Sequence, residues 1–462
     1  MLLSFRVENH RSLRDEQELL LLPSEQSEGG SPLPREITPL RVTGIFGANA
    51  SGKSALVKAL QFMRVSVLYG FGVGLGRPRP AFGAEDDDED RIPREPFLLD
   101  GESSARTSGF AVELLLKGVR HSYGFTVDHA EIVEEWLHLQ TGDGDDQVVF
   151  ERDGLAFTYG DRDPDAPELT DLLNLSPNTL LITVLANANP STFHSETVAA
   201  LSRVRQWFSR SLRLLQGDVA RGGPPVSRLP SSDPDRLERL ALLAQAVDTG
   251  IRGYSVKANP LTEEERGEIE ERFGKRRAPS YIRQRERGRV SFHHRGTGQD
   301  RPLDYADESS GTQALLALGA VMMSLLERGG TLVVDEIDTS LHTLLSGSLI
   351  SLFKDPENNP RGAQLVFTSH DTSLLGRVHG REVLTEDEIW LTEKDAEGAT
   401  SLFPMSSYES AGEENRDRRY LVGRYGAVPF VDEDLLIRAL RPHTHAREND
   451  GSGEESPHEE GP

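Results

Sequence analysis

The order of apolar and polar residues predicts an α/β protein in which short buried strands alternate with helices. Residues 41–60 show this order first: an apolar run ends at Phe46, a loop bounded by glycines follows, and apolar residues then recur at helical spacing. A second series begins after Leu303. There we expect a helix over residues 312–328, a strand over 331–334, a helix over 340–353 and a strand over 364–368.

The segments between these two series follow other periods. Residues 1–22 and 97–160 alternate between apolar and polar positions and are broken by turn residues, which predicts antiparallel strands. Residues 168–290 favour helices instead, with helical apolar spacing over 201–215 and 237–247. We therefore expect an antiparallel accessory sheet beside an α/β core, together with a mostly helical insertion.

These patterns predict five regions. The core has an N-terminal lobe, residues 1–68, and a C-terminal lobe, residues 299–440. Between the lobes lie a β accessory region, residues 97–160, and a helical, charged insertion, residues 168–298. Residues 441–462 are rich in Pro, Gly, Ser and Glu, so we expect a disordered acidic tail.

The loop within residues 41–60 carries the clearest motif. Its sequence, GANASGKS, fits the phosphate-loop pattern G-x-x-x-x-G-K-[ST]. Glycines let the backbone approach a phosphate, and the loop amides and the helix N-terminus then form an anion-binding nest. Lys53 supplies a charge for the outer phosphates, and the Ser54 hydroxyl can ligate Mg²⁺. The predicted nucleotide-binding residues are Gly47, Asn49, Ser51, Gly52, Lys53 and Ser54.

Two later strands end in side chains that suit the same chemistry. The strand TLVV is followed by Asp335 and Glu336, and the strand QLVFTS is followed by His370. A phosphate loop needs a carboxylate on a neighbouring strand to hold Mg²⁺, and Asp335 is placed for that role. Glu336, one step further along, can orient or deprotonate an attacking water. His370 can reach a γ-phosphate if its strand lies next to the strand that bears the acids.

A third motif opens the helix predicted over residues 312–328. Its sequence, ESSGTQ, places Ser309, Ser310 and Gly311 at a helix N-terminus, where hydroxyls and free amides make an anion site. This site has no obvious use in its own subunit, because the phosphate loop already fills that role.

Composition and charge restrict the partners. The chain contains no cysteine, which excludes disulfides, thiolate metal sites and cysteine nucleophiles. It lacks a signal peptide and any run of eighteen apolar residues, so we expect a cytoplasmic protein with no membrane span. The net charge of −24 disfavours DNA or RNA on average. Any nucleic-acid contact would therefore use the basic segment over residues 272–295, whose other interpretation is an exposed helical hairpin or loop.

Together these motifs resemble the ATP-binding-cassette class of ATPases, especially the soluble RecF-, SMC- and OLD-like heads. The resemblance implies ATP and Mg²⁺ as cofactors and a P-loop NTPase fold. It implies that Lys53 and Ser54 bind phosphate and Mg²⁺, that Asp335 supports the metal, that Glu336 is the catalytic base and that His370 is the switch histidine. It also implies that Ser309, Ser310 and Gly311 act in trans on a second subunit, with Asp338 and Ser340 on the dimer-contact loop. Gln140 is our candidate for the glutamine that such heads place near the metal.

A narrower resemblance comes from ESSGTQ, DEIDTSLH, FTSHD and the late segment RRYLVGRYGAVP. These look like the OLD-related ATPases of abortive-infection and other anti-phage systems, in which a separately encoded nuclease or toxin often accompanies the ATPase. The resemblance implies a homodimer or higher homo-oligomer that senses a trigger and controls such an effector.

Other functions stay open at this stage. A RecF-like repair protein would clamp DNA between two ATP-bound copies, using the basic segment. A transporter ATPase is disfavoured, because the signature reads SSGTQ in place of LSGGQ and because a long insertion interrupts the core. A nucleotide-gated scaffold would bind ATP and hardly hydrolyse it. Two candidate metal sites remain, one at His443 and His445 in the tail and one in the acidic cluster Asp432–Glu433–Asp434, which we interpret as a surface turn.

Overall fold

The computed structural model describes most of the chain, and the fold is given for those residues alone. They are residues 1–24, 38–71, 91–140, 146–160, 175–185, 196–216, 234–248, 250–257, 260–286, 289–339, 341–408, 415–428 and 432–441. Ser340, His443, His445 and the tail predicted to be disordered lie outside them, except Arg441. Residues up to 428 belong to one compact unit, and helix α12 (Glu433–Leu440) belongs to a second.

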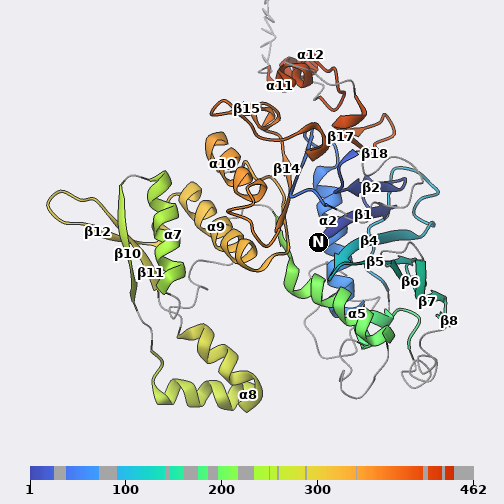
Figure 1. The fold of residues 1–462 in the computed structure, drawn as a ribbon, viewed down its shortest axis with the longest axis horizontal. Helices are drawn as coiled ribbons and strands as arrows, with labels where there is room; N and C mark the ends of the chain where they lie inside the picture. The colour runs from blue at the N-terminus through green and yellow to red at the C-terminus, as the bar shows by residue number, and fades with distance from the viewer. Residues whose placement is uncertain are drawn as a thin grey trace, which may run out of the picture. The chain divides into compact units, whose positions relative to one another are not determined.

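A six-stranded sheet carries the predicted site, with its strands in the order β18-β17-β3-β14-β13-β9 (Figure 1). Neighbouring strands from β9 to β17 are parallel, and β18 is antiparallel to β17. The predicted strands around residues 331–334 and 364–368 are confirmed. The bounds are β3 (Val42–Gly47), β9 (Leu212–Leu215), β13 (Thr331–Val334), β14 (Gln364–Ser369), β17 (Ile389–Lys394) and β18 (Thr400–Pro404).

Alternate side chains of these strands pack into two different cores. Val333 and Val366 join the cluster that includes helix α2 (Lys53–Tyr69). Leu332 and Phe367 join the cluster that includes helices α9 (Ser310–Arg328) and α10 (Thr343–Lys354). Because side chains alternate along a strand, a sheet covered on both faces needs continuous apolar strands, and TLVV and QLVF are of this kind. The α/β fold class predicted from the sequence is therefore confirmed.

A seven-stranded antiparallel sheet covers the other side of α2, in the order β2-β1-β4-β5-β6-β7-β8 (Figure 1). Phe110 and Phe125 of this sheet pack with Phe62 of α2 in one hydrophobic cluster. The predicted accessory sheet thus exists, and the two N-terminal strands belong to it. The bounds are β1 (Leu2–Glu8), β2 (Gln17–Leu20), β4 (Ser108–Leu116), β5 (Val119–Val127), β6 (Ile132–Gln140), β7 (Asp146–Asp153) and β8 (Ala156–Tyr159).

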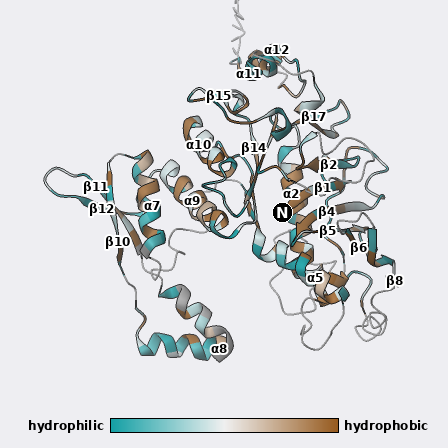
Figure 2. Ribbon diagram, viewed as in Figure 1, coloured by the Kyte–Doolittle hydropathy of each residue, from teal (hydrophilic) through white to brown (hydrophobic). Residues whose placement is uncertain are grey.

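A third, antiparallel sheet has the strand order β10-β11-β12 and packs on helix α7 (Pro234–Val247). Its strands are β10 (Ile251–Lys257), β11 (Arg289–His294) and β12 (Arg301–Asp304). Helix α8 (Glu263–Arg285) lies between β10 and β11 in the chain and bends at Gly274, whose φ is 71°. Figure 2 shows that the coloured part of α8 is largely hydrophilic, in line with the predicted exposed helical hairpin.

The insertion is less helical than predicted. Helices α4 (Leu181–Leu185) and α5 (Glu196–Gln206) are present. The helix expected over residues 201–215 ends in a short π-helix (Trp207–Ser211), and the chain continues as β9. The reason is tertiary: the apolar run LRLL pairs in parallel with Thr331–Val334, and this pairing outweighs the helical spacing.

The remaining elements are short. Helix α11 (Arg416–Leu421) and the hairpin of β15 (Arg377–Val378) and β16 (Arg381–Glu382) follow β14. In α12, Asp432 caps the helix by accepting a hydrogen bond from Leu435 N, so the acidic cluster predicted as a turn begins a helix. No group of three or more His, Asp or Glu side chains that could hold a metal is found among the described residues.

One described helix is long and apolar enough to cross a bilayer by length and composition alone. This is α9. Of its apolar stretch, 61% is buried inside the protein, which is typical of a core helix.

A buried ion pair links β6 and β7 of the accessory sheet, and its carboxylate also binds α4. Arg152 Nη1 lies 3.7 Å from Glu135 Oε2, and both side chains are fully buried. Leu181 N and Tyr123 Oη donate to the same carboxylate at 2.8 and 3.0 Å. Burial raises the pKa of Glu135, while the Arg152 charge and these donors oppose the rise. The carboxylate thus fixes the segment that packs on the end of α2, where Thr183 Oγ1 donates to Ser66 O.

We expect Arg152→Met to lower the free energy of unfolding by about 3–5 kcal/mol, because it leaves a buried carboxylate without its cation. Arg120→Met is the control, since Arg120 pairs with Glu113 at a partly exposed position of the same sheet. Its expected cost is about 1 kcal/mol or less. Urea denaturation measures both, and equal costs for the two variants would contradict the account.

Candidate functional site

The predicted phosphate loop connects β3 to α2 and needs glycine at both of its ends. The backbone φ is 158° at Gly47 and 111° at Gly52. A Cβ atom on Gly52 would lie 2.1 Å from Thr400 Oγ1, and one on Gly47 would lie 2.4 Å from Thr392 Oγ1. Contacts this close exclude any side chain, so the two glycines let the loop sit directly against β17 and β18.

Threonines of β17 and β18 hold the loop from behind. Thr392 Oγ1 lies 2.6 Å from Ser51 Oγ and donates to Phe46 O at 3.3 Å. Thr400 Oγ1 donates to Ser51 O at 2.9 Å. Ser51 is therefore turned toward the strands, and its hydroxyl holds the loop in shape. Neither threonine was predicted, because nothing in the sequence shows that strands some 350 residues downstream pair beside β3.

Lys53 folds back over the loop. Its Nζ donates to Gly47 O at 2.7 Å and to Ala48 O at 2.9 Å. Burial lowers the pKa of Lys53, while the nearby carboxylates of Glu336, Asp338 and Asp335 oppose this shift. The ammonium group is therefore held at the loop by two carbonyl oxygens.

Asp335 joins the loop to the neighbouring strands. It lies directly after β13, and its Oδ1 accepts hydrogen bonds from Ser54 Oγ at 3.1 Å and from Thr368 Oγ1 at 2.7 Å. The side-chain oxygens of Ser54 and Asp335, the predicted metal-holding pair, are thus in direct contact. Hydroxyl and carboxylate oxygens are the donors that Mg²⁺ takes in proteins, so this pair fits the ion.

Glu336 has a strained backbone. Its φ is 60°, a left-handed value that is unfavourable for a residue with a side chain. Two hydrogen bonds hold it: Glu336 N donates to Thr368 Oγ1 at 2.7 Å, and Thr339 Oγ1 donates to Glu336 Oε2 at 3.3 Å. Strain of this kind concentrates where a side chain must be aimed, and the side chain of Glu336 borders the same cavity as the phosphate loop.

His370 follows β14, the strand between β3 and β13. Its Nε2 lies 3.2 Å from Asp338 Oδ2, and Asp338 is largely buried. The sequence expectation required the histidine-bearing strand to adjoin the acid-bearing strand, and the sheet order meets that condition.

One cavity of about 520 Å³ brings the two halves of the sequence together. Four cations border it, Arg11, Lys53, Lys58 and Lys394, against the single carboxylate of Glu336. Arg11 is paired with Glu95 at 2.5 Å, so the positive charge along the cavity comes mainly from the three lysines. This charge favours a polyanion such as a nucleoside triphosphate. The other residues that line the cavity are Ser12, Asn49, Ala50, Ser51, Gly52, Ser54, Ala55 and His370.

Arg11 and Ser12 were missed by the sequence analysis. They follow β1 in a turn where Asn9 and Arg11 have φ values of 49° and 55°. Asn9 is buried, donates to Ser103 O at 2.8 Å and accepts from Phe97 N at 3.0 Å. The available signal was the sequence ENHRS directly after a strand, but only the fold shows that this turn meets the phosphate loop.

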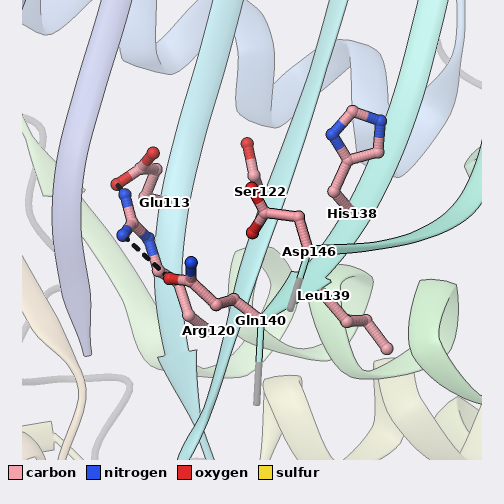
Figure 3. A pocket seen from close by; sticks show the side chains of 7 residues that line it. All are labelled: Glu113, Arg120, Ser122, His138, Leu139, Gln140 and Asp146. Atoms are coloured by element: carbon pink, nitrogen blue, oxygen red, sulfur yellow. Dashed lines mark hydrogen bonds and ion pairs between the residues drawn. The ribbon is translucent and has the colours of Figure 1, made fainter. Parts of the chain in front are cut away.

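Two predicted contributors lie elsewhere. Ser309, Ser310 and Gly311 begin α9, where Ser309 Oγ accepts from Thr312 N at 3.1 Å, and they do not line this cavity. Gln140, the candidate for the glutamine near the metal, lines a different cavity on the accessory sheet, where Arg120 lies between Glu113 and Gln140 (Figure 3). Arg120 Nη1 donates to Gln140 Oε1 at 3.1 Å. Gln140 is not among the residues that line the phosphate-loop cavity, so this placement does not support a nucleotide contact for it.

Comparison with known proteins gives a family and a set of distant structural relatives. Residues 42–376 match the family described as "AAA domain, putative AbiEii toxin, Type IV TA system". No curated protein matches the chain. A solved Smc head bound to the C-winged helix domain of ScpA is similar at 12% identity and a TM-score of 0.37, covering 87% of this chain and 96% of that one. RecF bound to ATP is similar at 12% identity and a TM-score of 0.33, covering 87% and 97%.

The matched residues include the phosphate loop, Asp335, Glu336 and His370, and so contain most of the cavity just described. They also make up well over half of the chain. The chain therefore belongs to this family of AAA domains.

Proposed function

We propose that the chain binds ATP with Mg²⁺ in the phosphate-loop cavity, hydrolyses it, and closes on it as a dimer. The observation that carries this proposal is the shared acceptor Asp335 Oδ1, which receives hydrogen bonds from both Ser54 and Thr368. It ties the loop that would hold the phosphates to the strands that carry the two acids.

Each residue of the cavity has a role in this proposal. Lys53 and the loop amides hold the outer phosphates, and Ser54 and Asp335 hold Mg²⁺, which when bound offsets charge on the phosphate oxygens. Glu336 orients or deprotonates the attacking water, and the strained backbone keeps its carboxylate at the cavity. His370, whose Nε2 lies 3.2 Å from Asp338 Oδ2, would contact the γ-phosphate.

The second half of the site comes from another copy. Ser309 and Ser310 are exposed at the start of α9 and lie outside the cavity of their own subunit. A helix N-terminus with free amides binds anions, so these serines suit the phosphates held by a second subunit. Asp338 lies on the loop that would meet that subunit, and Ser340, expected to act with it, is outside the described residues. The smallest assembly is thus a homodimer.

The ATPase would act as a sensor or scaffold for a separately encoded nuclease or toxin in anti-phage defence. Two points support this: the matched family is described by a toxin of type IV toxin–antitoxin systems, and the motifs resemble the ATPases of abortive-infection systems. The neighbouring gene tests it, because a nuclease or toxin encoded there would favour this role over DNA repair.

We expect Lys53→Ala to abolish ATP hydrolysis and Glu336→Gln to reduce it by about 100-fold or more, the usual range for loss of a general base. Release of phosphate from ATP measures both, with Arg120→Met as a control in the accessory sheet. A Glu336→Gln rate equal to that of wild type would remove Glu336 from catalysis. A wild type that binds ATP without releasing phosphate would favour the nucleotide-gated scaffold.

The RecF-like alternative depends on the basic half of α8 and the strand after it. We expect the combined reversal of Arg276, Arg277, Arg283 and Arg285 to glutamate to leave DNA binding unchanged, because the −24 charge of the chain opposes polyanions. Fluorescence anisotropy with duplex DNA and ATP at low salt measures it. Tight binding by wild type that the reversal abolishes would favour the repair function instead.

A further inference from the structure

A histidine and a buried glutamate stand directly before the serines of α9. Glu308 precedes Ser309, and its Oε1 lies 2.9 Å from His294 Nε2 on β11. The Glu308 side chain is only 3% exposed. A carboxylate buried to this extent needs a hydrogen-bond donor, and the imidazole of His294 supplies one.

The peptide around Glu308 is fixed by further hydrogen bonds. Gln313 Nε2 donates to Glu308 O at 2.9 Å and to Ala306 O at 3.1 Å. Tyr305 Oη donates to Gln313 O at 3.1 Å. The first turn of α9 and the turn before it therefore form one unit, and the His294–Glu308 pair joins this unit to the β10-β11-β12 sheet.

A second attachment runs along α9 itself. Leu316 and Ala320 of α9 share a hydrophobic cluster with Leu240 of α7 and with Val290 and Phe292 of β11. At Gly319 the two helices are so close that a Cβ atom would lie 2.2 Å from Leu243 Cδ2. The β10-β11-β12 sheet and α7 thus pack on α9 through apolar side chains along the helix. The His294–Glu308 pair adds a polar contact next to the N-terminus of α9.

We infer that His294 and Glu308 are positioning residues, which set the place of Ser309 and Ser310 from strand β11. This inference rests on the proposed function, because the position of the serines matters only if they complete the site of a second subunit. β11 pairs with a strand on each side and follows α8 in the chain. Because β11 is paired on both sides, His294 has a fixed place in the sheet from which to hold Glu308.

Mixing of impaired variants tests whether Glu308 acts on the serine half of the composite site rather than on the phosphate-loop half. Glu308→Ala should lower ATP hydrolysis about tenfold or more, and Glu308→Gln, which keeps an acceptor for His294, should stay within about twofold of wild type. Glu308→Ala mixed with Lys53→Ala should recover up to about one quarter of wild-type activity, because half of the dimers then hold one intact site. His294→Ala mixed with Glu308→Ala should recover nothing.

Two controls make the outcome decisive. Glu327→Ala removes the ion pairs of α9 with Arg236 and Arg239 at the opposite end of the helix and should leave activity unchanged. Ser310→Arg should behave like Glu308→Ala in the mixing test. If Ser310→Arg is rescued by Lys53→Ala and Glu308→Ala is not, the inference is overturned.

Failure of the proposed function has a different signature. If wild type does not hydrolyse ATP, or if Ser310→Arg and Lys53→Ala fail to complement each other, the composite ATP site is wrong. Amide hydrogen exchange in ATP-free protein then tests the positioning role without relying on ATP hydrolysis. Glu308→Ala should speed exchange about tenfold or more in the first turn of α9, where Glu327→Ala should not, and equal rates would overturn the inference.

Discussion

One carboxylate oxygen, Asp335 Oδ1, holds the candidate site together. It accepts hydrogen bonds from Ser54 at the start of α2 and from Thr368 at the end of β14, while its own backbone follows β13. This meeting depends on the parallel register of β13, β14 and β3, which brings their carboxyl ends to the same edge of the sheet. The apolar strands matter to function because a shift of register would separate these three groups.

Around this contact the protein accepts local strain. Glu336 and Ala50 have left-handed φ values of 60° and 64°, and the Lys53 ammonium is desolvated among backbone carbonyls. Each would relax if the surroundings were loose. Hydrogen bonds prevent this relaxation. Thr392 and Thr400 bond to Ser51 of the loop, and Thr368 accepts a hydrogen bond from the backbone of Glu336. We conclude that β17 and β18 stabilise the loop in its strained conformation.

Candidate site residues could be predicted from the sequence where the motif consists of residues adjacent in the chain. The phosphate loop, the strand before Asp335 and the strand before His370 each combine an apolar run with the side chains that follow it. What depended on distant pairing was not readable. The run Leu212–Leu215 has helical spacing in the sequence but pairs with β13 as a strand. Arg11 and Ser12 meet the loop only through the fold, and Gln140 lines another cavity.

In the proposed dimer, each ATP site is formed by half-sites from two subunits. The absence of cysteine from the chain allows a direct test of this arrangement. Asn49→Cys borders the phosphate-loop cavity, and Ser310→Cys lies at the exposed start of α9. The two variants, each also carrying Glu336→Gln, are mixed and treated with a short bismaleimide with and without ATP. The account predicts a cross-link between the two chains that forms with ATP and is lost when Lys53→Ala is added to the Asn49→Cys chain. Cross-linking that is absent with ATP, or that is unchanged by Lys53→Ala, would contradict it.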